Sequence, residues 1–358
     1  MSKKNVAHAR PSESFWVRNK KSGGYLLKKT AGNKAYKFIR FLLLFGLCFM
    51  IIQPLLSKIS VSFMIEEDLY DSTIISIPRH LTLDNYRNVA SPALLNYNKS
   101  LFNTFMVATL VSLLQVASAT LVGYGFARFE FPLKKFWFFA VILTVIVPPQ
   151  TISTALHLTF SHFNPLGIVG MLNGGKEINL LASKFYIPII PAIGGFAGFK
   201  APLPYLLMSL TCQGLKNGLY IYMIRQFFAG VPKSLEEAAY VDGCSTFKTF
   251  WRVILPDAVP ILVSCFLFAF VWQWTDTFYT KMFIPASAVP TLSMNLSGLS
   301  DATAKWKETV TYTGNVATVG QRNQFVSTGT LMVIAPLLVL YLFAQKGFVE
   351  SISSTGLK

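Results

Sequence analysis

The chain has 358 residues, of which 53% are apolar and only 13% are charged, and its mean hydropathy is +0.47. Soluble domains carry roughly 25% charged residues. This deficit, together with several apolar runs of about 20 residues, excludes an ordinary soluble protein and indicates an all-α, polytopic membrane protein. The formal net charge is +16, but the basic residues gather at the N-terminus and in short loops beside apolar runs. That placement is typical of a membrane orientation signal and argues against nucleic-acid binding.

The N-terminal segment, residues 1–37, is polar and strongly basic, with Glu13 as its only acidic residue. Such a segment resists export, so we expect the N-terminus to lie in the cytoplasm. Its interleaved aromatic and leucine residues favour contact with anionic lipid headgroups; a basic tail that only sets the topology is the alternative. No small-residue cleavage site follows the first apolar run, 38–56, which we interpret as an uncleaved anchor.

Six apolar segments are long enough to span a bilayer, and six spans place both termini in the cytoplasm, as the charges of the loops favour. The segments are 38–56, 100–127, 136–156, 204–228, 257–279 and 325–344. They define a membrane domain over residues 38–347, which is followed by a cytoplasmic tail, 348–358. The proline pair Pro148-Pro149 should bend or end the third span.

Two stretches outside these spans are predicted to lie on the outer side. In residues 157–202, prolines and a glycine pair interrupt the apolar run 185–199, which argues against a straight helix. We interpret this stretch as an outer, re-entrant segment that packs on the helix bundle. Residues 281–325 are predicted to form a long polar loop between the last two spans.

The fourth span carries three polar residues near its middle, Gln213, Lys216 and Asn217, and Gly214 and Gly218 can loosen the helix there. Polar side chains at that depth face a cavity or a partner, because exposing them to lipid costs on the order of several kcal/mol. They either line a transport path or form hydrogen bonds between helices. A third interpretation makes them the proton or ion site of a secondary transporter.

The clearest local signal is the short polar stretch at residues 231–256, which we call the elbow. Pro232 opens it, and Ser234 with Glu237 has the pattern of a capping box at the start of a short helix. Gly243 is well placed to end that helix. The pattern therefore predicts a helix of about two turns between them.

A second short helix should follow, capped by Ser245 and closed by Leu255-Pro256. The small side chains of Ala238 and Ala239 leave room for another surface to close over the first helix as a groove. We therefore expect the elbow to be a rigid, cytoplasmic docking element.

Neither a metal site nor a nucleotide site is indicated. The four cysteines form no CxxC pair and are typical of small apolar fillers. The four histidines include no HxxxH or HExxH spacing, and no GxxxxGK[ST] loop is present to hold nucleotide phosphates. We expect this chain to have no catalytic residues, no bound cofactor or metal, and no enzymatic activity of its own.

The elbow also resembles a known motif. Glu-Ala-Ala at 237–239, three residues, Gly243, nine residues, Val253, one residue and then Leu255-Pro256 is similar to the EAA motif of permease subunits in bacterial binding-protein-dependent ABC importers. Isoleucine is usual in the family where this chain has Val253. Further stretches resemble the carbohydrate-uptake branch of that family, of the MalG-like type: LTLDNYRNV (81–89), GYGFARFEF (123–131), IRQFFAGVPKSLEEAAYVDG (224–243), VWQWTDTFY (271–279) and QKGFVESISSTGLK (345–358).

The resemblance implies the type I ABC importer fold in a bacterial cytoplasmic membrane. The chain would pair with a second, homologous permease subunit on two ATPase subunits, which would bind ATP and Mg²⁺. A periplasmic or extracellular solute-binding protein would deliver a sugar, and the loop 281–325 would reach into it. The residues that the resemblance implies in coupling to the ATPase are Glu237, Ala238, Ala239, Asp242, Gly243, Leu255 and Pro256.

The resemblance also directs attention to a sugar path. Its candidate residues are Gln213, Lys216, Asn217, Trp272, Trp274, Asp276 and Tyr279. The aromatic residues either stack on a sugar ring or anchor the helix at the membrane interface. Asp276 either accepts hydrogen bonds from sugar hydroxyls or is solvated at the outer mouth. The alternative function, a secondary transporter, predicts internal inverted repeats and transport without ATP; the sequence has no convincing repeat.

Overall fold

The computed structural model describes residues 16, 19–20, 23, 25–71, 73–74, 77–172, 175–181, 186–190, 199–284, 289–311 and 317–355. Most of the basic segment before Tyr25, with its predicted headgroup contact, lies outside the described residues. The chain divides into two units, Met1–Ser60 and Val61–Lys358.

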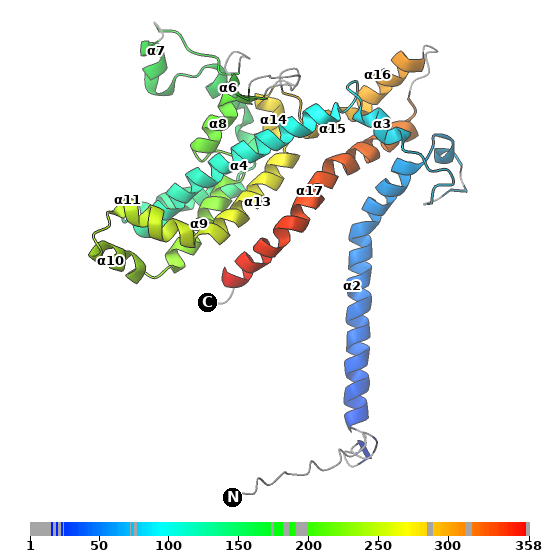
Figure 1. Cartoon of the computed structure of the whole chain (residues 1–358), viewed down its shortest axis with the longest axis horizontal. Coiled ribbons are helices and arrows are strands. Elements are labelled where there is room, and N and C mark those ends of the chain that lie inside the picture. The colour runs from blue at the N-terminus through cyan, green and yellow to red at the C-terminus, as the bar shows by residue number, and fades with distance from the viewer. Residues whose placement is uncertain are drawn as a thin grey trace, which may run out of the picture. The chain divides into compact units, whose positions relative to one another are not determined.

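The long helix α2 (Tyr25–Phe63) makes up most of the described part of the first unit and ends just inside the second (Figure 1). Its 39 residues rise about 58 Å, almost twice the hydrocarbon thickness of a bilayer, which is about 30 Å. The part from Ala31 onward is apolar enough to cross a membrane and contains the predicted first span. None of its most apolar window is buried within the chain. Its length and composition therefore make α2 a candidate membrane span.

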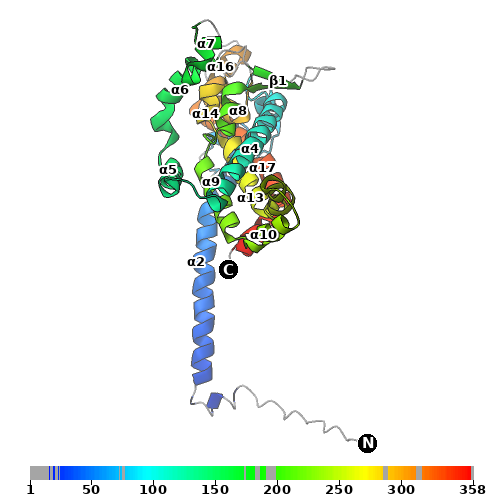
Figure 2. The same ribbon diagram turned by 90° about the vertical axis from the view of Figure 1, so that its left-hand side faces the viewer.

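Helix α4 (Tyr97–Arg128) is the central helix of the second unit (Figures 1 and 2). It packs against α8 (Leu203–Leu210), α9 (Asn217–Gly230) and α13 (Val259–Thr275). Its buried face is rich in Ser, Thr, Ala and Gly, and such small residues let helix backbones approach closely in lipid. A Cβ added at Gly123 would lie only 3.0 Å from Cγ2 of Ile224 on α9. This predicted span therefore packs inside a helix bundle.

Several of the predicted spans are interrupted helices. α5 (Lys134–Ile146) is followed by η2 (Pro149–Ile152) and α6 (Ser153–Ser161), and the chain bends by 103° between them. The bend predicted at Pro148-Pro149 is therefore confirmed. The fourth segment is split into α8 and α9, which are separated by Thr211–Lys216. Among the described residues, three continuous helices are long and apolar enough to cross a membrane, or five segments if each bent pair counts as one. A total of six crossings therefore stays a prediction.

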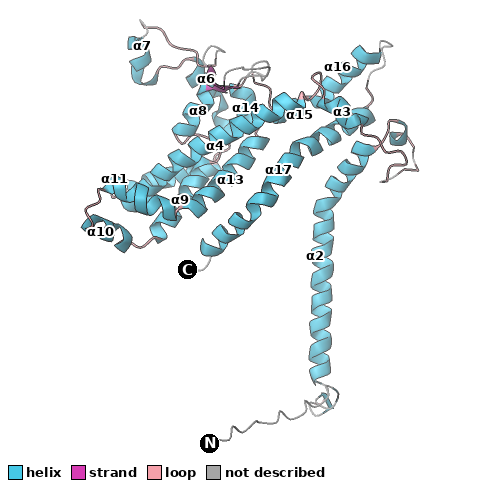
Figure 3. Cartoon of the chain, viewed as in Figure 1, coloured by secondary structure: helices cyan, strands magenta, loops and turns pink. Residues whose placement is uncertain are grey.

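The stretch 157–202 contains a small β-hairpin as well as short helices. After α6 come η3 (Pro165–Gly167) and α7 (Ile168–Leu172), and then the antiparallel strands β1 (Tyr186–Ile190) and β2 (Phe199–Pro202) (Figure 3). The prolines that exclude a helix here also break the ladder, because the register shifts between Pro188 and Ile190. The fold is otherwise helical, as expected, and the described part of this stretch packs on the bundle through Phe160, which contacts Phe283 edge to face.

The segment 281–325, predicted as a long polar loop between the last two spans, is largely helical. It contains the end of α14 (Phe278–Phe283), α15 (Leu292–Ser297), α16 (Leu299–Thr311) and the start of α17 (Val319–Thr355). Helices α15 and α16 pack closely against α17, which explains why this segment is helical. A Cβ added at Gly329 of α17 would lie 2.6 Å from Cδ2 of Leu299 at the start of α16. α17 runs from these helices back toward the elbow, and its ends lie at opposite ends of the second unit (Figures 1 and 2).

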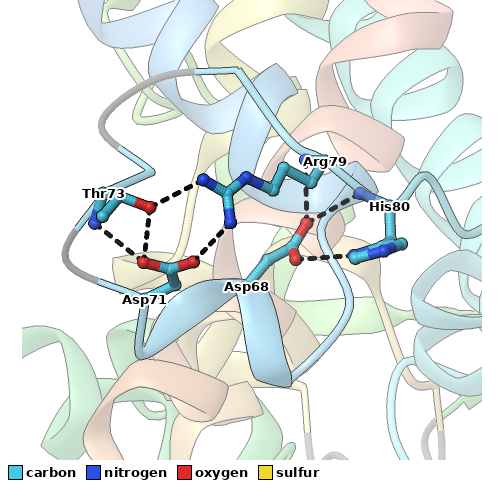
Figure 4. Close-up of polar contacts among 5 residues, drawn as sticks. All are labelled: Asp68, Asp71, Thr73, Arg79 and His80. Atoms are coloured by element: carbon cyan, nitrogen blue, oxygen red, sulfur yellow. Dashed lines mark hydrogen bonds and ion pairs between the residues drawn. The ribbon is translucent and has the colours of Figure 1, made fainter.

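The segment that joins α2 to α3 (Asp84–Ala90) is held by two aspartates (Figure 4). The Asp68 carboxylate, which is 4% exposed, accepts hydrogen bonds from the backbone N–H groups of Arg79 and His80 at 3.0 and 2.9 Å and from Nδ1 of His80 at 3.0 Å. Asp71 forms an ion pair with Arg79 and accepts from Thr73. The His80 ring contributes most to a pKa of Asp68 below its usual range, and the backbone donors add to it.

We expect Asp68→Asn to lower the melting temperature of the detergent-purified protein at pH 7, because an amide cannot accept all three hydrogen bonds. The lowered pKa means that the carboxylate stabilises the fold above its unfolded-state pKa of about 3.9. That contribution disappears as the pH falls through the lower folded-state pKa. The difference in melting temperature between the two proteins should therefore shrink below about pH 4. The exposed Asp84→Asn is the control, and equal melting temperatures of wild type and Asp68→Asn at pH 7 would contradict the assignment.

Candidate functional site

The first helix of the elbow, α10 (Ser234–Val241), begins differently from the prediction. Lys233 is its N-cap and no side chain caps it, so the capping box between Ser234 and Glu237 is not formed. The N–H of Glu237 instead donates to the carbonyl oxygen of Lys233 at 3.0 Å, and the carbonyl of Pro232 already accepts from Leu235 at 3.3 Å. Because the ring of Pro232 sets a helical φ, the helix starts before Ser234 can act as a cap.

Helix α10 ends in a Schellman motif. The prediction that Gly243 ends this helix is confirmed. Gly243 has a φ of +76°, a left-handed conformation that a glycine adopts without strain. Its N–H donates to Tyr240, and the N–H of Cys244 donates to Ala239, which satisfies the last carbonyls of the helix. The oxygen of Ser245 then accepts from the N–H of Lys248, so the predicted second cap is also confirmed.

The rest of the elbow is a short, irregular helical run. It consists of α11 (Thr246–Thr249), the π-helical turn η5 (Phe250–Ile254) and α12 (Leu255–Asp257), which leads into α13 after a 73° bend. Phe250 and Ile254 are buried against the bundle. The elbow lies at the opposite end of the second unit from α14, α15 and α16 (Figures 1 and 2).

A buried ion pair attaches α10 to the central helix. Oε1 of Glu236 lies 2.9 Å from Nε of Arg128, and the two side chains are only 11% and 6% exposed. The hydroxyl of Tyr124 donates to the same carboxylate at 3.4 Å, and Nη2 of Arg128 donates to the carbonyl of Val231 at 2.9 Å. The end of α4, the start of the elbow and α10 are therefore joined in one polar cluster. Both charged residues lie in stretches that resemble the family, but the predicted coupling set did not include them.

The face of the elbow that points away from the bundle is partly apolar. Val241 is 88% exposed, and the other exposed large side chains are Leu235, Tyr240, Phe247 and Trp251. Of the residues predicted to contact an ATPase, Glu237, Ala238, Asp242, Gly243 and Pro256 are exposed and Leu255 is half-buried. Ala239 is buried within the chain, so its side chain cannot reach a partner.

A second feature is a cleft of about 400 Å³ where three interrupted helices meet. It is lined by the α5–η2 bend (145–150), by Leu215 and Lys216 at the α8–α9 break, and by 275–278 between α13 and α14. Trp272 completes the lining. Nζ of Lys216 lies 5.4 Å from the centre of the Trp272 ring. The cleft therefore contains two of the candidate path residues, one cationic and one aromatic.

The structure does not bring the other aromatic candidates into this cleft. Trp274 is buried on the far side of α13, where Nε1 donates to the carbonyl of Val333 on α17 at 3.1 Å. Tyr279 is buried in the core and stacks with Phe283. Both side chains therefore hold helices together and do not line this cleft.

Asp276 reaches the cleft but is occupied by the protein itself. Its carboxylate accepts from the Tyr205 hydroxyl at 2.9 Å and from the hydroxyl and N–H of Thr280 at 2.9 and 2.8 Å. The N–H groups of Phe278 and Tyr279 donate to its other oxygen. Asp276 therefore caps the start of α14, and is neither a free acceptor for sugar hydroxyls nor a solvated carboxylate.

The remaining polar candidates differ in burial. Gln213 is exposed, whereas Asn217 is buried and both atoms of its amide have no hydrogen-bond partner in the described part of the chain. The hydrogen bonds between helices expected of Asn217 are therefore absent there. No group of three or more His, Cys, Asp or Glu side chains among the described residues has the geometry to hold a metal ion.

Comparison with known proteins fits this arrangement. Residues 119–352 match the family described as binding-protein-dependent transport system inner membrane component. The chain belongs to that family. It is a multi-pass membrane protein of the permease type, and the matched region contains the whole elbow and the cleft.

Curated relatives extend the similarity over most of the chain. The probable ABC transporter permease protein YurM of Bacillus subtilis is 25% identical over 306 residues, which cover 85% of this chain and 83% of the relative. The arabinooligosaccharides transport system permease protein AraQ of Halalkalibacterium halodurans is 22% identical, covering 87% of this chain and 93% of the relative. The maltodextrin transport system permease protein MalD of Streptococcus pneumoniae is also 22% identical, with coverage of 89% and 94%.

A solved structure shares the fold. A chain from the crystal structure of a bacterial ABC transporter involved in the import of the acidic polysaccharide alginate superposes with a TM-score of 0.62. The alignment covers 88% of this permease and 97% of that chain, at 16% identity.

We expect either Arg128→Met or Glu236→Gln to destabilise the permease by about 3 kcal/mol, because each leaves one buried charge without its partner. The double variant should recover much of the loss, since both charges are then gone. Thermal unfolding in detergent micelles measures all three. The pair Glu130 and Lys134, in which the Glu130 side chain is 87% exposed, provides the control, and Glu130→Gln with Lys134→Met should have a smaller effect than the single changes in the buried pair. Additive effects of the Arg128 and Glu236 changes would contradict a direct pair.

Proposed function

We propose that this chain is a transmembrane permease subunit of an ATP-driven carbohydrate importer, and that the elbow couples it to an ATPase. Family membership supports the importer class. The substrate class is supported by relatives named for the transport of arabino-oligosaccharides and maltodextrin, which align with nearly the whole chain. The chain would form half of the translocation pathway, together with a second, homologous permease subunit.

The observation that carries the coupling role is the way the elbow is attached. A rigid helix with exposed apolar side chains, such as Val241 and Phe247, offers a surface for a groove on another protein. The buried pair of Glu236 and Arg128 fixes that helix to α4, and α4 packs against α8, α9 and α13. A displacement of α10 would therefore be passed directly to the helices of the bundle.

The partners follow from this role. Two ATPase subunits would bind the elbows of the two permease subunits and would hold ATP and Mg²⁺, so the chain itself would have no ATPase activity. A periplasmic or extracellular solute-binding protein would dock at the other end, where α14, α15 and α16 lie. This arrangement places the elbow and both termini in the cytoplasm, in agreement with the basic segments beside the apolar runs.

The cleft is the segment of the pathway that this subunit would contribute. Interrupted helices are tolerated inside a membrane where they line a water-filled cavity or are buried in protein. Three such interruptions border the cleft, and its lining mixes apolar side chains with Lys216, Gln150 and Thr275. That mixture suits a sugar, which offers hydroxyl groups and apolar ring faces together.

We expect Val241→Asp to reduce sugar-stimulated ATP hydrolysis by the reconstituted importer about tenfold, the effect of losing one good interface contact. Because the side chain is 88% exposed, the change should leave folding and membrane insertion intact. Ile77→Asp is the matched control, since Ile77 is similarly exposed, at 82%, and lies far from the elbow in the sequence. Normal coupling in Val241→Asp would contradict an ATPase contact through α10.

The orientation can be tested with a cysteine at Lys248, an exposed position of the elbow. In intact cells, the thiol of Lys248→Cys should react with membrane-impermeant maleimide only after the membrane is opened. A cysteine at Ile77 should react in intact cells, because the proposed topology places it outside. Labelling of Lys248→Cys from the outside would overturn the cytoplasmic placement of the elbow.

A further inference from the structure

Among the described residues, the ammonium group of Lys216 has no acidic partner within ion-pair distance. Lys216 lies at the break between α8 and α9, within the predicted fourth span. The other charged residue of the cleft, Asp276, is held by five donors from Tyr205 and the start of α14. A lysine in such a place is costly unless it is paired or faces water. Asp276 is 7% exposed, whereas Lys216 is half-buried, so the ammonium is the more accessible of the two charged groups that line the cleft.

The backbone holds this charge in place at a further cost. Lys216 has a φ of +61°, and Cys212 at the other side of the same break has a φ of +59°. A left-handed conformation costs a residue other than glycine on the order of 1 kcal/mol. Gly218, just after the break, is also required, because a Cβ there would lie 2.4 Å from Oγ1 of Thr144 on α5. The break is therefore tightly constrained, and it directs Lys216 toward Trp272.

Trp272 supplies the second half of a sugar-binding surface. Its side chain is 46% exposed, and the Lys216 ammonium lies 5.4 Å from its ring centre. A cation at this distance is attracted to the ring and is kept near it. A ligand that stacks on the open part of the indole would bring its substituents beside the ammonium group.

We propose that the cleft selects carbohydrates that carry a negative charge, such as the carboxylate of a uronic acid. The inference rests on the proposed importer function and names its substrate class. The charge of the sugar pairs with Lys216, the apolar face of its ring stacks on Trp272, and Gln150 and Thr275 are in reach of its hydroxyl groups. The volume of about 400 Å³ holds a sugar of one or two rings at a time, and a longer chain passes through unit by unit. A neutral sugar leaves the lysine unpaired and binds more weakly.

The charge of the cleft can be measured without knowing the natural substrate. In the assembled importer, Thr275→Cys places a thiol in the cleft lining, and its reaction is followed with an anionic and a cationic methanethiosulfonate reagent of similar size. We expect the anionic reagent to react roughly tenfold faster relative to the cationic one than it does with a free thiol. Adding Lys216→Met should remove this preference, whereas Lys216→Arg and the exposed-site control Lys99→Met should retain it. The parent without Thr275→Cys accounts for labelling of the native cysteines.

The sugar specificity is tested with two probes, trigalacturonate and maltotriose. Trigalacturonate should protect Thr275→Cys from labelling, maltotriose should not, and Lys216→Met should abolish the protection. No reagent preference, a preference unchanged in Lys216→Met, or equal protection by maltotriose would overturn the proposal. Uptake of both probes by the wild-type importer, measured with and without ATP, tests the anionic selectivity separately from the importer function. Uptake of maltotriose alone refutes the anionic selectivity and leaves the importer function standing, whereas ATP-independent uptake refutes the importer function itself.

Discussion

The buried ion pair between Arg128 and Glu236 is the contact on which the proposed mechanism depends. Two charges removed from water are stable together only when each is the other's partner and neighbouring groups complete their hydrogen bonds. Tyr124 and the carbonyl of Val231 supply part of those bonds here, and Nε of Arg128 is held by the ion pair alone. Such a pair tolerates little change of geometry, so it joins α10 to α4 as one body. An elbow attached only by apolar contacts could slide on the bundle without moving it.

A second constraint comes from the lipid environment, where every backbone group needs a partner inside the protein. The helix breaks at the cleft meet this requirement with local donors and acceptors. The N–H of Gln213 donates to Met208, the hydroxyl and N–H of Thr151 donate to Pro148, and Asp276 caps the first turn of α14. Because these bonds close each break, the interruptions are stable features of the fold. The cleft between them follows from the same bonds.

The parts of this fold that were predictable from the sequence are those set by local chemistry. Gly243 ends α10, and Pro148-Pro149 bends the third segment, because glycine and proline act on their own backbone. The choice between Glu236 and Glu237 is different, because it depends on how α10 is rotated about its axis, and Arg128 on a distant helix decides that. The pairing of β1 with β2 was not predicted, because it also depends on a distant contact. Prolines exclude a helix, but they do not indicate which strand will pair with which. The two tryptophans of α13 were separable in principle, since residues two apart on a helix lie about 200° apart.

Two properties distinguish the polar residues that hold the fold from those available to a ligand. They are the burial of the side chain and whether its hydrogen-bonding groups already have partners in the protein. Asp276 lines the cleft and Trp274 is close to it in the sequence. The polar atoms of both side chains already form hydrogen bonds within the protein. The ammonium group of Lys216 forms no such bond with a described residue, although Lys216 occupies a strained backbone conformation and carries a full charge. Folding alone gives no reason to keep these two costs at one residue, because a glycine there would relieve both. A role outside the folded chain is the remaining source of compensation, and a counter-charge on the transported molecule is the one that the cleft has room to receive.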